Sequence, residues 1–127
     1  MTDLRTPLKN VRGLGSAKDG THHFLVQRIT AIALIPLGLW FIWLALTLMH
    51  ADYATARALL SQPLHATLFA AFAIALFWHA QLGLQVVIED YVHARWLEIA
   101  SQLAVKFVCA GAALAGVIAI IRVYIGQ

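Results

Sequence analysis

The chain has 127 residues, of which 61% are hydrophobic and only 12% charged, against about 25% charged residues in an average soluble domain. A soluble domain of this length still exposes about a third of its unfolded-chain surface to water, which excludes so apolar a composition. The formal net charge of +3 does not indicate nucleic-acid binding, because the basic residues are sorted by position along the chain and are not gathered on one face. Lipid is therefore the expected solvent.

The cysteine content limits the chemistry of the chain. Cys109 is the single cysteine, whereas an iron–sulfur cluster needs about four thiolates and a disulfide needs two. No Gly-rich phosphate loop follows a predicted strand, so a nucleotide site is not expected either. Any redox catalysis must be shared with other subunits.

Residues 1–28 form a polar and basic N-terminal segment. They contain no apolar core of about seven or more residues, so we do not expect a secretory signal peptide. Pro7 and the glycines Gly13, Gly15 and Gly20 predict a loop or flexible arm. We expect the chain to become helical from Thr21, with this residue as the N-cap.

Three long uncharged or nearly uncharged stretches follow, at about 29–49, 64–88 and 103–125. About 20 residues in a helix cross a hydrocarbon core of roughly 30 Å, so each predicts a transmembrane helix. Pro36 should kink the first helix, because it lacks a backbone donor. Residues 50–63 and 89–102 are read as polar connections. The prediction is one all-α membrane domain over 1–127, with small residues of the third span (Gly111, Ala112, Ala115 and Gly116) allowing close helix packing.

The distribution of lysine and arginine predicts the orientation of the chain. The flanks on the side of the N-terminus carry seven of these residues and the opposite flanks carry two, so the N-terminus is expected inside, in the cytoplasm or matrix. The seven are Arg5, Lys9, Arg12, Lys18, Arg28, Arg95 and Lys106, and the two are Arg57 and Arg122. Trp40, Trp43, Tyr91 and Trp96 are interpreted as aromatic anchors near the interfaces.

His79 lies midway along the second span. An imidazole in hydrocarbon loses its solvation, so it should face the bundle interior and hold a partner. Two interpretations remain open from the residue alone. The first is a hydrogen bond to a neighbouring helix, and the second is axial ligation of haem iron.

Asp90 follows His79 by eleven residues in the same predicted helix. Eleven steps of about 100° return almost to the starting direction, at a rise of about 16 Å, so both residues should share one face. Gly83 is one turn from His79 and can either admit the flat edge of a porphyrin or serve helix packing. Asp90 and Tyr91 together place an acid and a phenol at the inner boundary, suited to a quinone carbonyl and its protons. An interfacial anchor beside a helix end is the alternative.

His22 and Arg28 precede the first span on the inside. Basic groups at this height can pair with haem propionates, Arg28 through two parallel hydrogen bonds. Pairing with lipid phosphate is the alternative. The remaining histidines, His23, His50, His65 and His93, are interpreted as ordinary boundary residues.

Taken together, these residues resemble the smaller hydrophobic membrane-anchor subunits of succinate dehydrogenase, respiratory complex II. The second-span pattern of that family is a histidine, ten residues and then Asp-Tyr, and residues 79–91 read HAQLGLQVVIEDY. Residues 21–34, THHFLVQRITAIAL, are similar to the family's histidine followed six residues later by an arginine and an apolar helix. The three-span layout covers nearly the whole chain.

The resemblance implies haem b held between His79 and a histidine of the larger cytochrome b anchor subunit, with His22 and Arg28 near the propionates. It implies that Tyr91 hydrogen-bonds ubiquinone and that Asp90 supports this site. The expected complex is a succinate:quinone oxidoreductase of the bacterial cytoplasmic (inner) membrane. Its flavoprotein subunit would hold FAD and oxidise succinate, and its iron–sulfur subunit would carry the electrons to the quinone.

Two other functions stay open at this stage. The haem-free anchor of a fumarate reductase would share the fold and the anchoring role. A small oligomeric transporter would use His79 in a proton or substrate path, but no Asp or Glu lies deep in any of the three spans. An absorption spectrum of the complex would distinguish the first alternative, which has no haem. Copurification of soluble flavin and iron–sulfur subunits would distinguish the second, which has no such partners.

Overall fold

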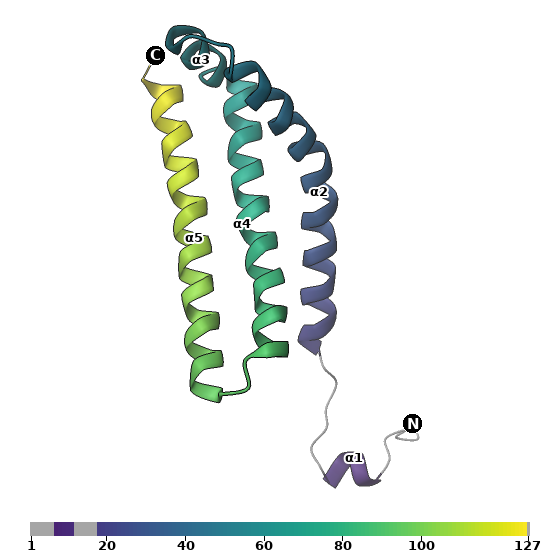
Figure 1. Ribbon diagram of the computed structural model, residues 1–127. Helices are drawn as coiled ribbons and strands as arrows, with labels where there is room; N and C mark the ends of the chain where they lie inside the picture. The colour runs from purple at the N-terminus through teal and green to yellow at the C-terminus, as the bar shows by residue number, and fades with distance from the viewer. Residues whose placement is uncertain (1–6, 12–17, 127) are drawn as a thin grey trace.

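The computed structural model describes residues 7–11 and 18–126 of the chain, and these residues form helices and short connections without a strand (Figure 1). The helices are α1 (Pro7–Val11), α2 (Lys18–Leu48), α3 (Tyr53–Leu60), α4 (Pro63–Tyr91) and α5 (Arg95–Ile125). Three of them, α2, α4 and α5, are long and apolar enough to cross a membrane. The predicted all-α architecture with three spans is confirmed.

The long helices extend beyond the apolar stretches that predicted them. Helix α2 already begins at Lys18, so the prediction of Thr21 as its N-cap is wrong, and Gly20 belongs to the helix. The predicted connection 89–102 is also mostly helical, because only residues 92–94 separate α4 from α5. Hydropathy marks the part of a helix that lies in lipid, whereas backbone hydrogen bonds continue into the polar flanks.

Two short helices lie where the sequence predicted irregular structure. Helix α1 occupies Pro7–Val11 in the segment that was expected to be loop, while Gly13 and Gly15 lie outside the described residues. Helix α3 occupies most of the connection between the first two spans, and Asp52 caps it: its Oδ1 accepts a hydrogen bond from the Thr55 amide at 3.0 Å. An aspartate at this position satisfies one of the free amides of the first turn.

The capping contact makes α3 sensitive to pH. Hydrogen bonds from the Thr55 hydroxyl and amide hold the pKa of Asp52 below its usual value of 3.8. A carboxyl with a lowered pKa stabilises the fold at pH values above its usual pKa, and this contribution is lost as the pH falls through the lower pKa of the folded state.

We expect Asp52→Ala to accelerate hydrogen exchange of the Thr55 amide at neutral pH, and Asp52→Asn to preserve its protection. Equal exchange in both variants would contradict the capping role.

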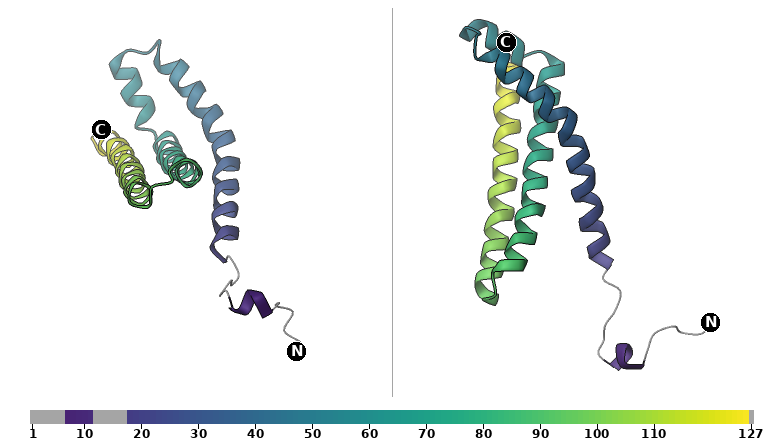
Figure 2. Two further views of the ribbon diagram at one scale, coloured as in Figure 1. Left: turned by 60° about the horizontal axis from the view of Figure 1, so that its bottom comes forward. Right: turned by 45° about the vertical axis from the view of Figure 1, so that its right-hand side comes forward.

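Helix α4 is the central element and packs against α5 on one side and α2 on the other (Figures 1 and 2). A Cβ atom added to Gly116 of α5 would lie 3.4 Å from the Cβ of Ala73 in α4, so the small residue does permit close packing there. Gly111, in contrast, faces open space. Phe41 and Phe72 stack between α2 and α4 with ring centroids 4.5 Å apart. The prediction of a small-residue packing face thus holds for part of α5.

Helix α2 is bent (Figure 2), and Pro36 lies within it. A proline removes one backbone hydrogen bond, and its ring clashes with the carbonyl four residues earlier in the helix. Both effects account for a bend of this kind.

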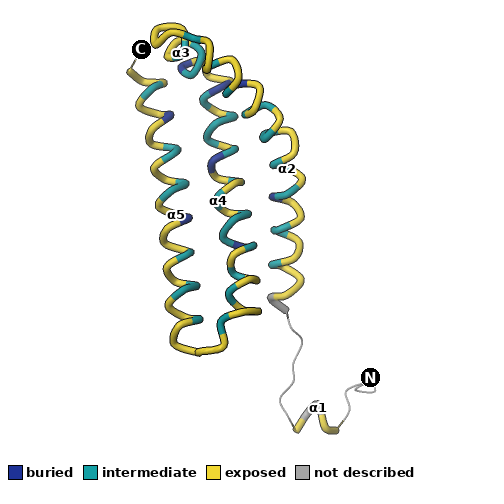
Figure 3. The backbone as a smooth tube through the Cα atoms, in the orientation of Figure 1, coloured by how far each residue is buried: buried dark blue, intermediate teal, exposed yellow. Residues whose placement is uncertain are grey.

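Few side chains are buried within the chain (Figure 3). In the apolar window of each span only 11% of the residues are buried. Leu44 is the one large side chain among the described residues that is almost fully enclosed, at 1% exposure. The apolar exterior of the three helices must therefore be covered by lipid or by other chains.

Candidate functional site

His79 lies in the middle part of α4 and is half-buried. Its Nδ1 is 3.0 Å from Oγ1 of Thr30 in α2, and Thr30 itself is buried. The histidine therefore faces the interior between two helices, as predicted. The hydrogen bond to a neighbouring helix, one of the two interpretations of this residue, is present, but it uses only one of the two ring nitrogens.

The other side of the His79 ring is open. Its Nε2 makes no hydrogen bond with any residue that the structure describes. One turn further along α4, a Cβ atom added to Gly83 would meet nothing within 4 Å, so packing within this chain does not explain the glycine. Neither the Nε2 atom of His79 nor the Gly83 position one turn away is used in contacts within the described part of this chain.

A metal ion held by protein side chains alone needs more protein ligands than a haem iron does. In residues 7–11 and 18–126, no group of three or more His, Cys, Asp or Glu side chains is placed to hold one. A haem needs only one or two protein ligands, because the porphyrin supplies the rest.

Asp90 and Tyr91 are the last two residues of α4, at the lower end of the bundle in Figure 1. The helix is continuous from His79 to this point, which retains the spacing of about 16 Å that the sequence predicts. Both side chains are exposed, Tyr91 to 77%, and neither hydrogen-bonds to another described residue. The acid and the phenol are therefore available to a ligand or to a second chain.

His22 and Arg28 are both exposed on the first third of α2. The Arg28 guanidinium carbon lies 5.1 Å from the centroid of the Phe24 ring. Six residues in a helix turn the direction by about 240°, so the two side chains leave α2 about 120° apart. They suit two separate acidic groups better than one.

A polar cluster that sequence reasoning missed lies at the same end of the bundle. Glu89 accepts hydrogen bonds from Gln85 at 2.9 Å and from Gln102 of α5 at 3.4 Å. A pocket of about 260 Å³ is lined by His23, Gln85 and Glu89, among others. The Nε2 of His23 is buried with no hydrogen-bond partner among the described residues. The signal in the sequence is that His23 precedes Thr30 by seven residues, which places both on one face of α2.

His65 is not an ordinary boundary residue, because it is buried at 8% exposure. Trp40 donates a hydrogen bond from Nε1 to His65 Nδ1 at 3.3 Å. The rings of Trp40 and Trp43 stack with the imidazole, at centroid distances of 5.9 and 6.0 Å. The two tryptophans, which the sequence indicated only as anchors, thus join α2 to α4. Their spacing of three residues, one face of a helix, was the available signal.

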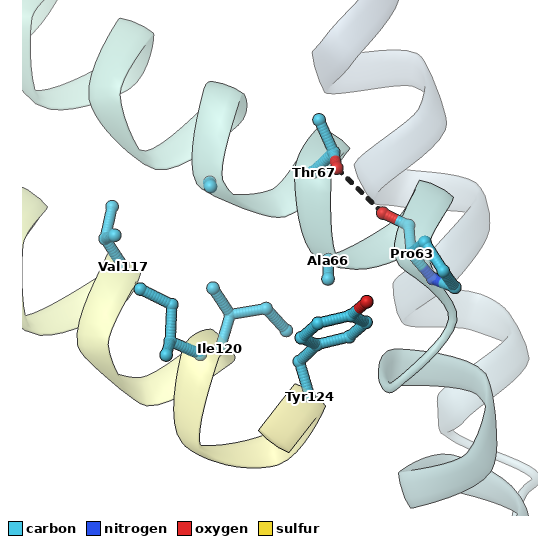
Figure 4. Close-up of a pocket in the computed structure, with 8 residues that line it drawn as sticks. Pro63, Ala66, Thr67, Val117, Ile120 and Tyr124 are labelled. Atoms are coloured by element: carbon cyan, nitrogen blue, oxygen red, sulfur yellow. Dashed lines mark hydrogen bonds between the residues drawn. The ribbon is translucent and has the colours of Figure 1, made fainter.

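A pocket of about 350 Å³ lies between α4 and α5 near the upper end of the bundle (Figure 4). Its lining is mainly apolar, with Ile120 and Tyr124 from α5 facing Pro63 and Ala66 of α4. The hydroxyl of Thr67 donates to the Pro63 carbonyl of its own helix at 2.8 Å. This pocket offers mainly hydrocarbon contact, with the hydroxyls of Thr67 and Tyr124 as its polar groups.

These features define a class of protein: a three-span membrane subunit with an interior histidine and an acid–phenol pair at a helix end. The family model for the succinate dehydrogenase/fumarate reductase transmembrane subunit matches residues 2–118, and the chain belongs to this family. No solved structure matches it.

Curated relatives agree with this assignment. A succinate dehydrogenase hydrophobic membrane anchor subunit of Rickettsia bellii is 38% identical, covering 82% of this chain and 83% of that protein. The protein of the same name from Rickettsia conorii is 31% identical, covering 93% and 94%. The one from Paracoccus denitrificans is 31% identical, covering 68% and 67%.

Proposed function

We propose that this chain is the membrane-anchor subunit of a succinate dehydrogenase, that it binds haem b jointly with a larger anchor subunit, and that it helps to form a quinone-reduction site. The observation that carries the proposal is His79, a half-buried imidazole in mid-span with one ring nitrogen held by Thr30 and the other open. The family and the names of the relatives support the anchoring role.

His79 is the axial ligand to the haem iron in this proposal. The haem supplies a one-electron redox centre within the membrane. Gly83 leaves room beside the ring, and the exposed His22 and Arg28, which point in different directions from α2, pair with one propionate each. A histidine of the larger anchor subunit completes the ligation.

Tyr91 and Asp90 are the contribution of this chain to the quinone site. The Tyr91 hydroxyl donates a hydrogen bond to a quinone carbonyl, and the Asp90 carboxylate orients donors and passes protons as the quinone is reduced. Both side chains are exposed at the end of α4, so the rest of the pocket comes from partner chains. Ubiquinone is the expected substrate.

Succinate is oxidised elsewhere in the complex. A flavoprotein with FAD and an iron–sulfur protein bring electrons from succinate to the quinone at the inner face of a bacterial cytoplasmic membrane. The basic flanks of the N-terminal side support an orientation with the N-terminus in the cytoplasm. The small number of buried side chains supports extensive contact with the larger anchor subunit.

Affinity purification of the complex through a tag on this chain, followed by an optical spectrum of the oxidised and reduced forms, tests the proposal. We expect flavin and iron–sulfur subunits to copurify and the reduced complex to show the absorption bands of haem b. Copurification of these subunits without haem b absorption bands would support the haem-free fumarate reductase type instead. Purification without soluble partners would support a transporter.

A further inference from the structure

The hydroxyl of Thr30 has more than one neighbour. Its Oγ1 lies 2.9 Å from the carbonyl oxygen of Val26 and 3.0 Å from that of Gln27, both in its own helix, and 3.0 Å from Nδ1 of His79. A hydroxyl has one proton to donate, and carbonyl oxygens only accept. Two of the three neighbours can therefore only accept the Thr30 proton, and both belong to α2.

The direction of the hydrogen bond to His79 follows. When the Thr30 proton is donated within α2, Oγ1 can only accept from His79, and the imidazole then carries its proton on Nδ1. A neutral imidazole has one N–H, so Nε2 keeps its lone pair. Thr30 is only 7% exposed, which leaves little access for water to replace it.

We propose that Thr30 is a positioning residue for a metal-ligating histidine: it fixes His79 in the tautomer and ring orientation that present Nε2 to the haem iron. This inference rests on the proposed haem-binding function. Metal-ligating histidines usually donate their other N–H to an acceptor, which orients the ring and raises its basicity. The acceptor here is a threonine oxygen of a neighbouring helix, 49 residues away in the chain.

Helix α2 offers a matched control. Thr47 also donates its hydroxyl proton to the carbonyl four residues earlier, Trp43, at 2.9 Å, but it is exposed and its hydroxyl hydrogen-bonds to no histidine side chain among the described residues. Thr30→Val and Thr47→Val remove the same group from the same kind of helical site. Only the first removes the acceptor for His79.

The test compares Thr30→Val, Thr30→Ser and Thr47→Val in the assembled complex, by haem content per flavin and by the haem reduction potential. We expect Thr30→Val to weaken haem retention by about 10- to 100-fold. In the haem that remains, the reduction potential should rise, because a less basic ligand stabilises the oxidised iron less. Thr30→Ser should restore both properties, and Thr47→Val should change neither.

Two outcomes would overturn the role of Thr30 while leaving the haem proposal intact. The first is a normal haem content and potential in Thr30→Val, and the second is an equal change in Thr47→Val. A wild-type complex without haem would instead refute the proposed function. In that case ¹⁵N NMR of the labelled complex still tests the direction of the hydrogen bond: a proton on Nε2 of His79 would contradict donation from Nδ1 to Thr30, and a proton on Nδ1 would support it.

Discussion

Replacing His79 with leucine is expected to remove haem b from the assembled complex. Leucine fills a similar volume but offers no lone pair, so the iron loses its ligand from this chain. Haem per flavin should fall at least about 10-fold. The measurement is the reduced-minus-oxidised spectrum of the purified complex, with the flavin content as the reference for assembly.

His65→Leu is the matched control for this experiment. His65 is another imidazole of α4, buried where His79 is half-buried, and it accepts a hydrogen bond from Trp40 of α2. Its loss should loosen the contact between these helices and leave the haem spectrum unchanged. If His79→Leu retained the wild-type spectrum, the ligand assignment would be wrong. Loss of haem in both variants would point to a general packing defect.

Replacing Tyr91 with phenylalanine is expected to lower quinone reductase turnover about 5- to 150-fold. The substitution leaves the ring in place and removes only the hydroxyl. In the proposed pocket, completed by partner chains, a buried quinone carbonyl that loses its donor is destabilised by about 1–3 kcal/mol, which corresponds to this range of rates if the hydrogen bond is fully developed in the transition state. The measurement is succinate-dependent reduction of a short-chain quinone.

Two controls isolate the quinone step. Succinate oxidation with an artificial soluble acceptor bypasses the membrane subunits and should remain at the wild-type rate. Tyr53→Phe removes the hydroxyl of another exposed tyrosine, at the start of α3 near the opposite end of the bundle, and should leave both assays unchanged. Equal turnover of wild type and Tyr91→Phe with quinone would exclude Tyr91 as a donor.

The three spans were predictable because hydropathy depends only on local composition. Helix α3 was not, because the polar residues of segment 50–63 resemble those of an irregular loop. The N-cap Asp52 was the one local signal for this helix. The full lengths of the three long helices were not predictable either, since the helices continue past the apolar residues that define the pattern.

The site was predictable in part. His79 was singled out by its depth in an apolar stretch, and its place between helices follows from the cost of exposing an imidazole to lipid. Its partner Thr30 was not foreseen, because the contact depends on how α2 lies against α4. The same reason explains His23: its burial depends on which face of α2 meets α4, and this face is known only when the helices are placed.

The shortage of buried side chains in each span has a consequence for the supply of this chain in the cell. Because few side chains are buried within the chain, contacts with lipid and with neighbouring subunits must supply part of the free energy that fixes the three helices relative to one another. We expect copies made in excess of their partners to be packed less firmly and to be cleaved more readily by proteases. We expect the abundance of the other subunits of the complex to set how much of this chain persists in the membrane.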